Sequence, residues 1–307
     1  MDDERPATIC AVGPSPRNAG RVAVAGALTI AFSAILVRKA NVAPVTAAVF
    51  RCGYAVPVLA VLAWIERQRY GARSWREVKL SIWAGAFFAA DLICWHYAIR
   101  DVGAGLATVL GNLQVVLVGV VAWLTLGERP ERRVVAAIPI ALVGIVLISG
   151  MVGGGAYGAD PLKGVLFGVA TGLTYAGFIL VLRQSGRDLR RPVGPLFEAT
   201  AAATIFALAA GLVIGDLDLA PSWPAHGWLL LLAMSSQVVG WLLISVSLPR
   251  LPAALTSVLL TVQPVGSVIL GVILLKEAPS FLQLVGVACI FSGVIVATAR
   301  RSARVTA

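Results

Sequence analysis

The chain has 307 residues, of which 59% are hydrophobic and only 13% charged. A soluble domain carries about 25% charged and about 45–50% apolar residues, so this composition excludes an ordinary globular protein. The formal net charge is +10, but the basic residues lie between apolar segments rather than in one patch, and we expect no nucleic-acid partner. Long apolar segments separated by short basic or Gly/Pro-rich breaks predict an all-α polytopic membrane protein in the lipid bilayer.

The two ends of the chain, residues 1–20 and 300–307, are predicted to be cytoplasmic tails, the second of them basic. The first twenty residues begin with acidic side chains and contain Pro and Ser, without the basic stretch and apolar core of a signal peptide. The four cysteines are scattered, three of them inside apolar segments. This pattern predicts packing rather than a disulfide or a metal site. We expect neither a metal nor another cofactor.

Ten apolar segments each approach the ~20 residues that a helix needs to cross ~30 Å of hydrocarbon. Because lipid tolerates only structures that satisfy their own backbone hydrogen bonds, segments of this length are predicted to be helices. They cover residues 21–38, 43–65, 80–99, 104–126, 133–150, 162–182, 193–214, 227–248, 252–275 and 281–299.

The Lys and Arg residues predict how these helices are oriented. With the N-terminus inside, 19 of the 25 basic residues fall on the inner side, five fall in outer loops, and Arg51 lies within a helix. Cytoplasmic loops of membrane proteins carry an excess of Lys and Arg. The split places both termini in the cytoplasm and predicts a multi-pass protein of the plasma (cytoplasmic) membrane, a cell inner membrane.

Two stretches indicate an internal duplication. "TVLGNLQVVLVGVVAWLTLGERP" (Thr108–Pro130) aligns with "SVLLTVQPVGSVILGVILLKEAP" (Ser257–Pro279) at a constant offset of 149 residues. Apolar matches arise easily by chance, but the shared polar pair Gln114 and Gln263 does not. Each copy holds five helices, an odd number, so the second copy must enter the membrane from the opposite side.

The predicted architecture is therefore ten transmembrane helices arranged as two inverted five-helix repeats, residues 21–150 and 162–299. Inverted repeats in transporters place the binding site near the bilayer midplane, at the interface between the repeats. A duplicated bundle without a transport role is the simpler alternative.

With these features the chain resembles the drug/metabolite transporter superfamily, and within it the EamA-type exporters. The resemblance covers about residues 20–300 and rests on the inverted five-helix arrangement, an Arg in the second helix, Gly-Glu-Arg-Pro at 127–130 and Lys-Glu-Ala-Pro at 276–279. It implies secondary transport of small metabolites and no enzymatic activity, and it specifies no substrate.

A carboxylate stands in an otherwise apolar stretch, "FFAADLICWHYAI" (Phe87–Ile99). At 1.5 Å per residue, Asp91 lies roughly 16 Å from the start of its segment, where a charge costs at least about 2.5–3.5 kcal/mol. Trp95 follows four residues later on the same helical face, and Gln237 and Trp241 repeat this spacing in the eighth segment. The symmetry predicts a shared central cavity.

Arg51 lies in the second segment, roughly 12 Å from the outer side and at nearly the same depth as Asp91. The ordinary interpretation is a structural ion pair, because charges inside the membrane usually pair. The functional alternative is that Asp91 takes up a proton or contacts a cationic substrate group, and both hold if the pair opens during transport. Phe50–Arg51 aligns with Phe197–Glu198, so Glu198 is a gating candidate or a side chain that extends to the interface.

Other polar side chains in the apolar segments are candidates for the cavity or for interhelical hydrogen bonds, which are worth ~0.6–2 kcal/mol. We expect Asn112, Gln114, Gln263 and Tyr175 in the substrate or ion cavity, and His96, Ser33 and Thr261 in secondary positions.

Together these features favour a secondary active transporter that exports small metabolites, such as amino acids or related amphiphilic compounds, by alternating access coupled to protons or to an exchanged metabolite. A multidrug exporter of aromatic cations would also suit the pairing of Asp91 with Trp95 and Trp241. A structural or lipid-modifying membrane protein is a different class, but the chain has no D-x-x-D pair, H-E-x-x-H or phosphate-binding loop. We expect a non-enzymatic monomer or homodimer.

Overall fold

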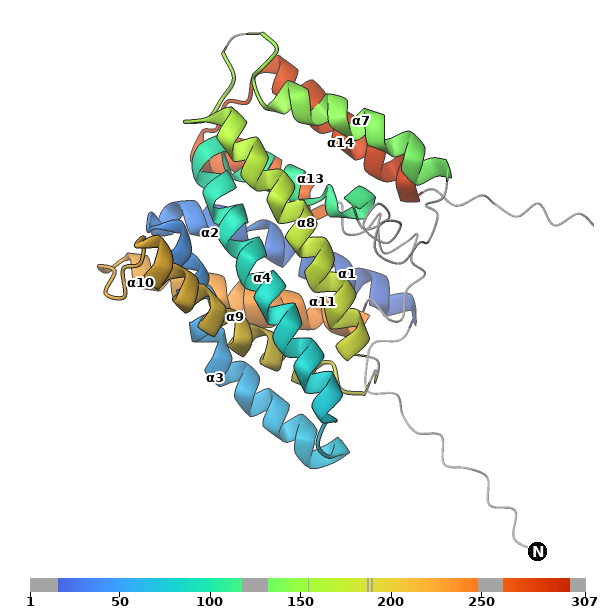
Figure 1. The fold of residues 1–307 in the computed structure, drawn as a ribbon, viewed down its shortest axis with the longest axis vertical. Helices are drawn as coiled ribbons and strands as arrows, with labels where there is room; N and C mark the ends of the chain where they lie inside the picture. The colour runs from blue at the N-terminus through green and yellow to red at the C-terminus, as the bar shows by residue number, and fades with distance from the viewer. Residues whose placement is uncertain are drawn as a thin grey trace, which may run out of the picture.

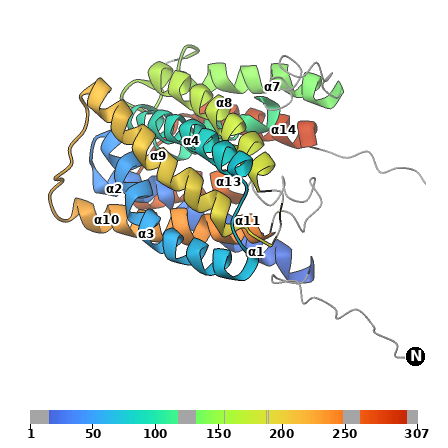
Figure 2. The ribbon, with the colours of Figure 1, turned by 60° about the horizontal axis from the view of Figure 1, so that its bottom comes forward.

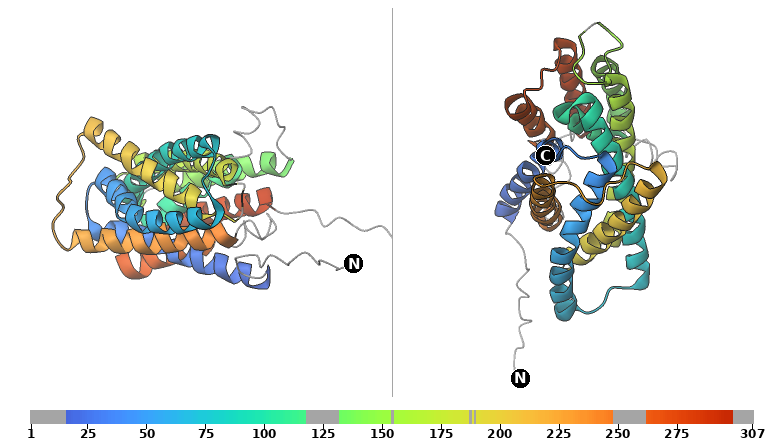
Figure 3. Two further views of the ribbon diagram at one scale, coloured as in Figure 1. Left: turned by 90° about the horizontal axis from the view of Figure 1, so that it is seen from below. Right: turned by 90° about the vertical axis from the view of Figure 1, so that its left-hand side faces the viewer.

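The computed structural model describes residues 16–117, 132–153, 155–186, 188, 190–247 and 262–298. Within these ranges every regular element is a helix, and the helices form a single bundle (Figure 1, Figure 3). They are α1 (Pro16–Ala31), α2 (Ser33–Ala40), α3 (Pro44–Tyr70), α4 (Trp75–Val102), α5 (Ala104–Gly111), α7 (Arg132–Ile148), α8 (Pro161–Ser185), α9 (Val193–Ile214), α10 (Ala225–Leu232), the π-helix η1 (Ala233–Gly240), α11 (Trp241–Ser247), α13 (Val262–Leu275) and α14 (Phe281–Thr298).

Six helices of the described residues are long and apolar enough to cross a membrane, and shorter apolar helices accompany them. The long ones are Asn18–Ala40, Pro44–Tyr70, Trp75–Val102, Pro161–Leu182, Val193–Ile214 and Ala225–Ser247, and the shorter ones are Ala104–Leu117, Val135–Ile148, Val262–Leu275 and Phe281–Ala297. The prediction of an all-helical chain is confirmed for the described residues. The predicted segments 104–126 and 252–275 extend into residues outside them.

The bounds of α4 show how local chemistry sets the ends of a membrane helix. The Ser74 hydroxyl accepts a hydrogen bond from the backbone N–H of Glu77, whose carboxylate accepts one from the backbone N–H of Ser74. This capping box satisfies N–H groups that the first turn leaves free. At the other end Gly103 has a φ of +96°, which favours glycine, and α5 begins at the next residue.

Each described helix of the first half of the chain packs against a helix of the second half. The pairs are α1 with α11, α2 with α10, α3 with α9, α4 with α8, α5 with α13 and α7 with α14. Figure 2 shows α3 alongside α9, and Figure 1 shows α7 alongside α14. The core therefore lies between two sets of helices that are far apart in the sequence.

Hydrogen bonds at both ends of α4 and α8 show that this pair is antiparallel. The backbone N–H of Asp160, just before α8, donates to the carbonyl oxygen of Asp101 near the end of α4 at 3.1 Å. At the opposite ends of the two helices, the hydroxyls of Ser81 and Ser185 are hydrogen-bonded at 2.6 Å.

Two buried carboxylates join the ends of other cross-half pairs. Glu66, near the end of α3, accepts a hydrogen bond from the backbone N–H of Gly194 at the start of α9 at 2.7 Å. Glu277, after α13, accepts one from the backbone N–H of Ala104 at the start of α5 at 2.6 Å. Negative charge is favourable at a helix N-terminus, and charge-assisted hydrogen bonds are strong. These contacts hold α3 against α9 and α5 against α13 in antiparallel orientation.

Gly85 marks a close approach of α4 and α9. A Cβ atom added at this position would lie 2.6 Å from both the carbonyl oxygen of Ala199 and the Cβ of Ala202. Small residues permit backbone contacts of this kind between membrane helices.

Replacing Gly85 with alanine should therefore lower the stability of the bundle. We expect Gly85→Ala to reduce the free energy of unfolding by about 1–3 kcal/mol, the usual cost of overpacking a filled contact. The measurement is thermal unfolding of the purified protein in detergent. Gly53→Ala is the matched control, because its added Cβ would meet only the Cγ2 of Thr204, at 3.6 Å. Equal melting temperatures for the two variants would contradict this account of the α4–α9 contact.

Candidate functional site

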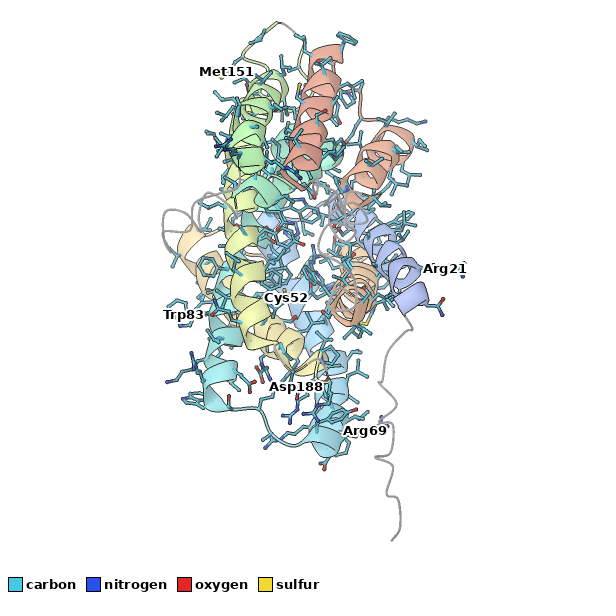
Figure 4. The ribbon with its side chains drawn as sticks, turned by 90° about the vertical axis from the view of Figure 1, so that its right-hand side faces the viewer. Arg21, Cys52, Arg69, Trp83, Met151 and Asp188 are labelled. Atoms are coloured by element: carbon cyan, nitrogen blue, oxygen red, sulfur yellow. The ribbon has the colours of Figure 1, made fainter. Side chains whose placement is uncertain are left out.

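A cavity of about 50 Å³ lies among the helices, and Arg51 and Asp91 are its charged described residues. Its described lining consists of Ile30, Ser33, Arg51, Phe88, Asp91, Leu92, Trp95, Thr108, Gly111, Asn112, Thr171, Tyr175, Trp241 and Gln263. Cys52, next to Arg51 in the chain, lies inside the bundle between Met151 toward one end and Asp188 toward the other (Figure 4). The described lining comes from both halves of the chain, and its two charged residues, Arg51 and Asp91, are buried.

Most of the sequence-predicted site residues meet at this cavity. Its lining includes Asp91, Trp95, Trp241, Asn112, Gln263, Arg51, Tyr175 and Ser33. Others lie apart from the described lining: Gln237 and Gln114 are buried, His96 bonds its Nδ1 to the carbonyl of Pro44 at 3.0 Å, and Glu198 pairs with Arg73 near one end of the bundle. Thr261 lies outside the described residues.

Arg51 is held by neutral groups. Its side chain is almost fully buried, its Nε donates a hydrogen bond to Oε1 of Gln237 at 3.3 Å, and its Cζ lies 5.5 Å from the centroid of the Trp95 ring. The amide of Gln237 donates in turn to the hydroxyl of Thr200 at 3.0 Å. A desolvated guanidinium gains stabilisation from an aromatic face and from a fixed acceptor. This chain of contacts joins α3, α4, η1 and α9.

The structural ion pair that the sequence suggested between Arg51 and Asp91 is not present in this conformation. The ion pairs among the described residues, defined by a nitrogen–oxygen distance of 4.0 Å or less, involve other partners. The physical reason is the rotation of the helices, which directs the guanidinium of Arg51 to Gln237 and the face of Trp95.

Asp91 lies among aromatic side chains of the cavity lining. Its residue is only 6% exposed, and Phe88 and Trp95 stand three residues before and four residues after it on the same face of α4. Opposite them lie Tyr175 and Trp241, whose rings make an edge contact with centroids 6.2 Å apart. Among the described residues, the indole N–H of Trp241 is buried without a hydrogen-bond partner. The site thus presents a carboxylate and a free donor inside aromatic walls.

Helix irregularities converge on this cavity. The α-helical hydrogen bonding between α1 and α2 is interrupted at Phe32, and α5 ends at Gly111 with a turn at Asn112. The π-helix η1 directly precedes Trp241. Irregular backbone at membrane depth is tolerated where it is buried in protein or lines a cavity, and π-helical turns are frequent at functional sites.

Sequence reasoning missed several lining residues, including Phe88, Thr108 and Thr171. Each stands three or four residues from a residue that was predicted, on the same helical face: Phe88 before Asp91, Thr108 before Asn112 and Thr171 before Tyr175. Including the residues one helical turn away from each predicted site residue would have identified them.

Comparison with known proteins identifies the family. The model of the EamA-like transporter family matches residues 21–150 and 162–299, which make up most of the chain. The chain belongs to the EamA-like transporter family. Members of this family are transporters and not enzymes, so the predicted resemblance to the family and the prediction of a non-enzymatic protein are confirmed. The protein is a multi-pass membrane transporter.

Individual relatives agree with this assignment. The chain is 23% identical over 289 residues to the "Uncharacterized transporter YetK" of Bacillus subtilis (strain 168), covering 91% of this chain and 87% of the relative. An "Uncharacterized transporter" of Archaeoglobus fulgidus is 26% identical over 172 residues, 56% of this chain and 59% of the relative. A solved crystal structure with 20% identity covers 92% of this chain and 97% of its own, with a TM-score of 0.60. This last match shows a similarity of fold alone.

Gln237 should be needed for stability because it is the acceptor for a buried charge. We expect Gln237→Leu, which keeps the side chain's approximate size, to lower the free energy of unfolding by about 1.5–3 kcal/mol, the cost of losing a hydrogen bond to a charged group. The measurement is thermal unfolding in detergent, with Gln184→Leu as control because Gln184 is an exposed glutamine. A Gln237 variant as stable as the control would show that Arg51 does not depend on this amide.

Proposed function

We propose that this EamA-like transporter exports small metabolites, amino acids or related amphiphilic compounds, by alternating access coupled to protons or to an exchanged metabolite. The observation that carries the proposal is Asp91, a buried carboxylate that has no ion-pair partner among the described residues and faces an aromatic cavity inside the bundle. An ionisable group inside a membrane bundle is a candidate for a proton or substrate pathway.

The proposed framework is a pair of inverted five-helix repeats, residues 21–150 and 162–299, giving ten transmembrane helices. The packing supports it, because α3, α5 and α7 each contact the helix that the repeat makes their counterpart, α9, α13 and α14. The repeat also makes α8 the counterpart of α1–α2, and α10–α11 the counterpart of α4. The two-fold axis that relates the repeats therefore converts the contact of α4 with α8 into the contact of α11 with α1, and both contacts are present. Counterpart helices of inverted repeats must be antiparallel, as the Glu66 and Glu277 contacts require.

We infer that both termini are cytoplasmic and that the protein lies in the plasma membrane. The connection between α3 and α4 and the one between α8 and α9 lie at the same end of the bundle, joined through Arg73, Ser185 and Arg191. The first connection and its flanking helix ends hold Arg67, Arg69, Arg73 and Arg76, and the second connection holds Arg187, Arg190 and Arg191. Cytoplasmic loops carry such an excess.

The cavity supports a division of roles. Asp91 would bind a proton or the cationic group of a substrate, Trp95 and Trp241 would form the walls against its apolar part, and Arg51 would supply a fixed positive charge that favours a substrate with an anionic group. A volume of about 50 Å³ is far below the ~300–1,000 Å³ of most small-molecule sites. The helices must therefore separate for a substrate to enter, which agrees with alternating access.

Export of aromatic cations by the same fold is the second candidate, because four aromatic side chains surround the carboxylate in the described lining: Phe88, Trp95, Tyr175 and Trp241. Such rings attract cations by their faces. The positive charge of Arg51 distinguishes the two candidates, since it repels a purely cationic substrate and attracts a zwitterion.

The test is metabolite release from cells that express wild type and Asp91→Asn at matched membrane levels, measured by mass spectrometry of the medium, with tolerance to toxic amino-acid analogues and to cationic dyes. We expect wild type to release one class of compound into the medium. The amount released by Asp91→Asn should be lower by a factor of about ten or more, the effect of losing a contact with a charged group.

Asp101→Asn is the matched control, because Asp101 is a buried carboxylate of the same helix that is paired with Arg100 at 2.7 Å. It should retain release. Equal release by Asp91→Asn and wild type would contradict the role of Asp91, and no release of any compound by wild type would contradict export itself.

A further inference from the structure

A polar cluster closes one end of the bundle, and its central side chain is Arg73 in the connection between α3 and α4. The guanidinium of Arg73 forms an ion pair with Glu198 on α9 and donates to the hydroxyl of Ser81 on α4 at 3.2 Å. It also donates to the carbonyl oxygen and the hydroxyl of Ser185, the last residue of α8, at 2.8 and 2.7 Å. One side chain thereby contacts α4 of the first half and both α8 and α9 of the second half.

Among ion pairs of the described residues, Arg73–Glu198 is the one that joins the two halves of the chain. The others are local: Arg100 with Asp101, and both Arg190 and Arg191 with Asp188. The side chains of Arg73 and Glu198 are 9% and 18% exposed, so the pair is largely desolvated. Arg73 also has Ser81 and Ser185 as further hydrogen-bond partners. This distinguishes it from an ordinary surface ion pair, which contributes little.

A close helix contact and the aromatic wall of the cavity follow this cluster along α4. Ser81 and Gly85 precede Asp91 on α4 by ten and six residues, about 15 and 9 Å at 1.5 Å per residue. At Gly85, α4 touches the backbone of α9 too closely for a Cβ atom. Above it, the ring of Phe88 stacks on Phe178 at 4.5 Å between centroids and lies at the edge of Trp241. From the cluster inward, α4 thus passes the close contact at Gly85 and then reaches Phe88, which lines the cavity together with Trp241.

We propose that Arg73, Glu198, Ser81 and Ser185 form an ionic latch that closes the cytoplasmic path to the cavity and must open for the inward-facing conformation. The proposal rests on the proposed transport function and adds to it a named gate. Separation of α8 and α9 from α4 would break every contact of Arg73 with the opposite half at once, so the latch has two discrete arrangements, closed and open. Packed interfaces of this kind switch rather than deform gradually.

The surroundings allow such a latch to open. A polar hollow of about 260 Å³ lies next to it, lined by residues that include Arg73, Ser74, Glu77, Ser185 and Asp188. Water in this hollow can take over the hydrogen bonds of the arginine and the carboxylate when they separate. Each charged side chain of its described lining already has a partner: Arg73 pairs with Glu198, Arg191 pairs with Asp188, and Glu77 caps α4. We therefore propose no ligand for the hollow itself.

The test measures access to the cavity and needs no substrate. The native cysteines Cys10, Cys52, Cys94 and Cys289 are replaced, and Thr171→Cys is introduced as a probe, because Thr171 lines the cavity from α8. A membrane-impermeant thiol reagent is applied to inside-out and right-side-out vesicles. We expect Arg73→Gln and Glu198→Gln to raise the labelling rate from the side that carries the latch by about ten- to a hundredfold, the range for losing a hydrogen bond to a charged group.

Two further variants make the result specific. Arg190→Gln removes an exposed arginine whose ion pair with Asp188 is local, and it should label like wild type. Arg73→Lys keeps the positive charge and should label more slowly than Arg73→Gln. Unchanged labelling in both glutamine variants would overturn the latch, as would an equal increase in Arg190→Gln. Because labelling is independent of transport, the latch can fail while export by Asp91 stands, and the reverse.

Discussion

The structure depends on the burial of a permanent charge inside an apolar bundle. Arg51 cannot lose its charge at any relevant pH, and an unsolvated guanidinium in hydrocarbon would be prohibitively costly. The protein replaces water with the carbonyl of Gln237 and the face of Trp95, and Thr200 orients the amide of Gln237 by accepting from its nitrogen. Helices α3, α4, η1 and α9 must hold their mutual rotation to maintain this arrangement. The cavity lies beside this arrangement, and its described lining comes from α1–α5, α8, α11 and α13.

Solvating Arg51 with neutral groups has a consequence for Asp91. A carboxylate that neutralised Arg51 would be a structural element, whereas here Asp91 faces the cavity with aromatic neighbours on both sides. The arrangement separates a fixed positive charge from an ionisable acid within one small chamber. That combination can bind a group that carries both signs of charge, or exchange a proton for a cation, without breaking the contacts that hold the bundle together.

The sequence predicted the helices well, because long apolar segments identify them. It predicted side-chain partners less well, because these depend on how the helices pack. Long apolar segments led to helices, and the spacing of Asp91 with Trp95 led to a cavity among them, and the described residues contain both. The inverted repeat that the 149-residue offset suggested stays a prediction. The partner of Arg51 could not be predicted, because the rotation of a helix about its axis is set by tertiary contacts. Arg73 entered the sequence analysis only in the count of basic residues on the inner side. Its side chain is in fact largely buried and forms an ion pair with Glu198 in the other half of the chain. The π-helical turn before Trp241 likewise leaves no local sequence pattern.

Contact between Asp91 and the transported compound can be tested directly by ligand-induced stabilisation. Purified wild type and Asp91→Asn would be melted in detergent with a panel of amino acids, other small zwitterions and aromatic cations. A ligand that binds only the folded protein raises the melting temperature according to its affinity. If Asp91 contacts the compound, we expect a compound with a cationic group to stabilise wild type and to lose most of this effect in Asp91→Asn. Equal stabilisation of both proteins by every binding compound would contradict it.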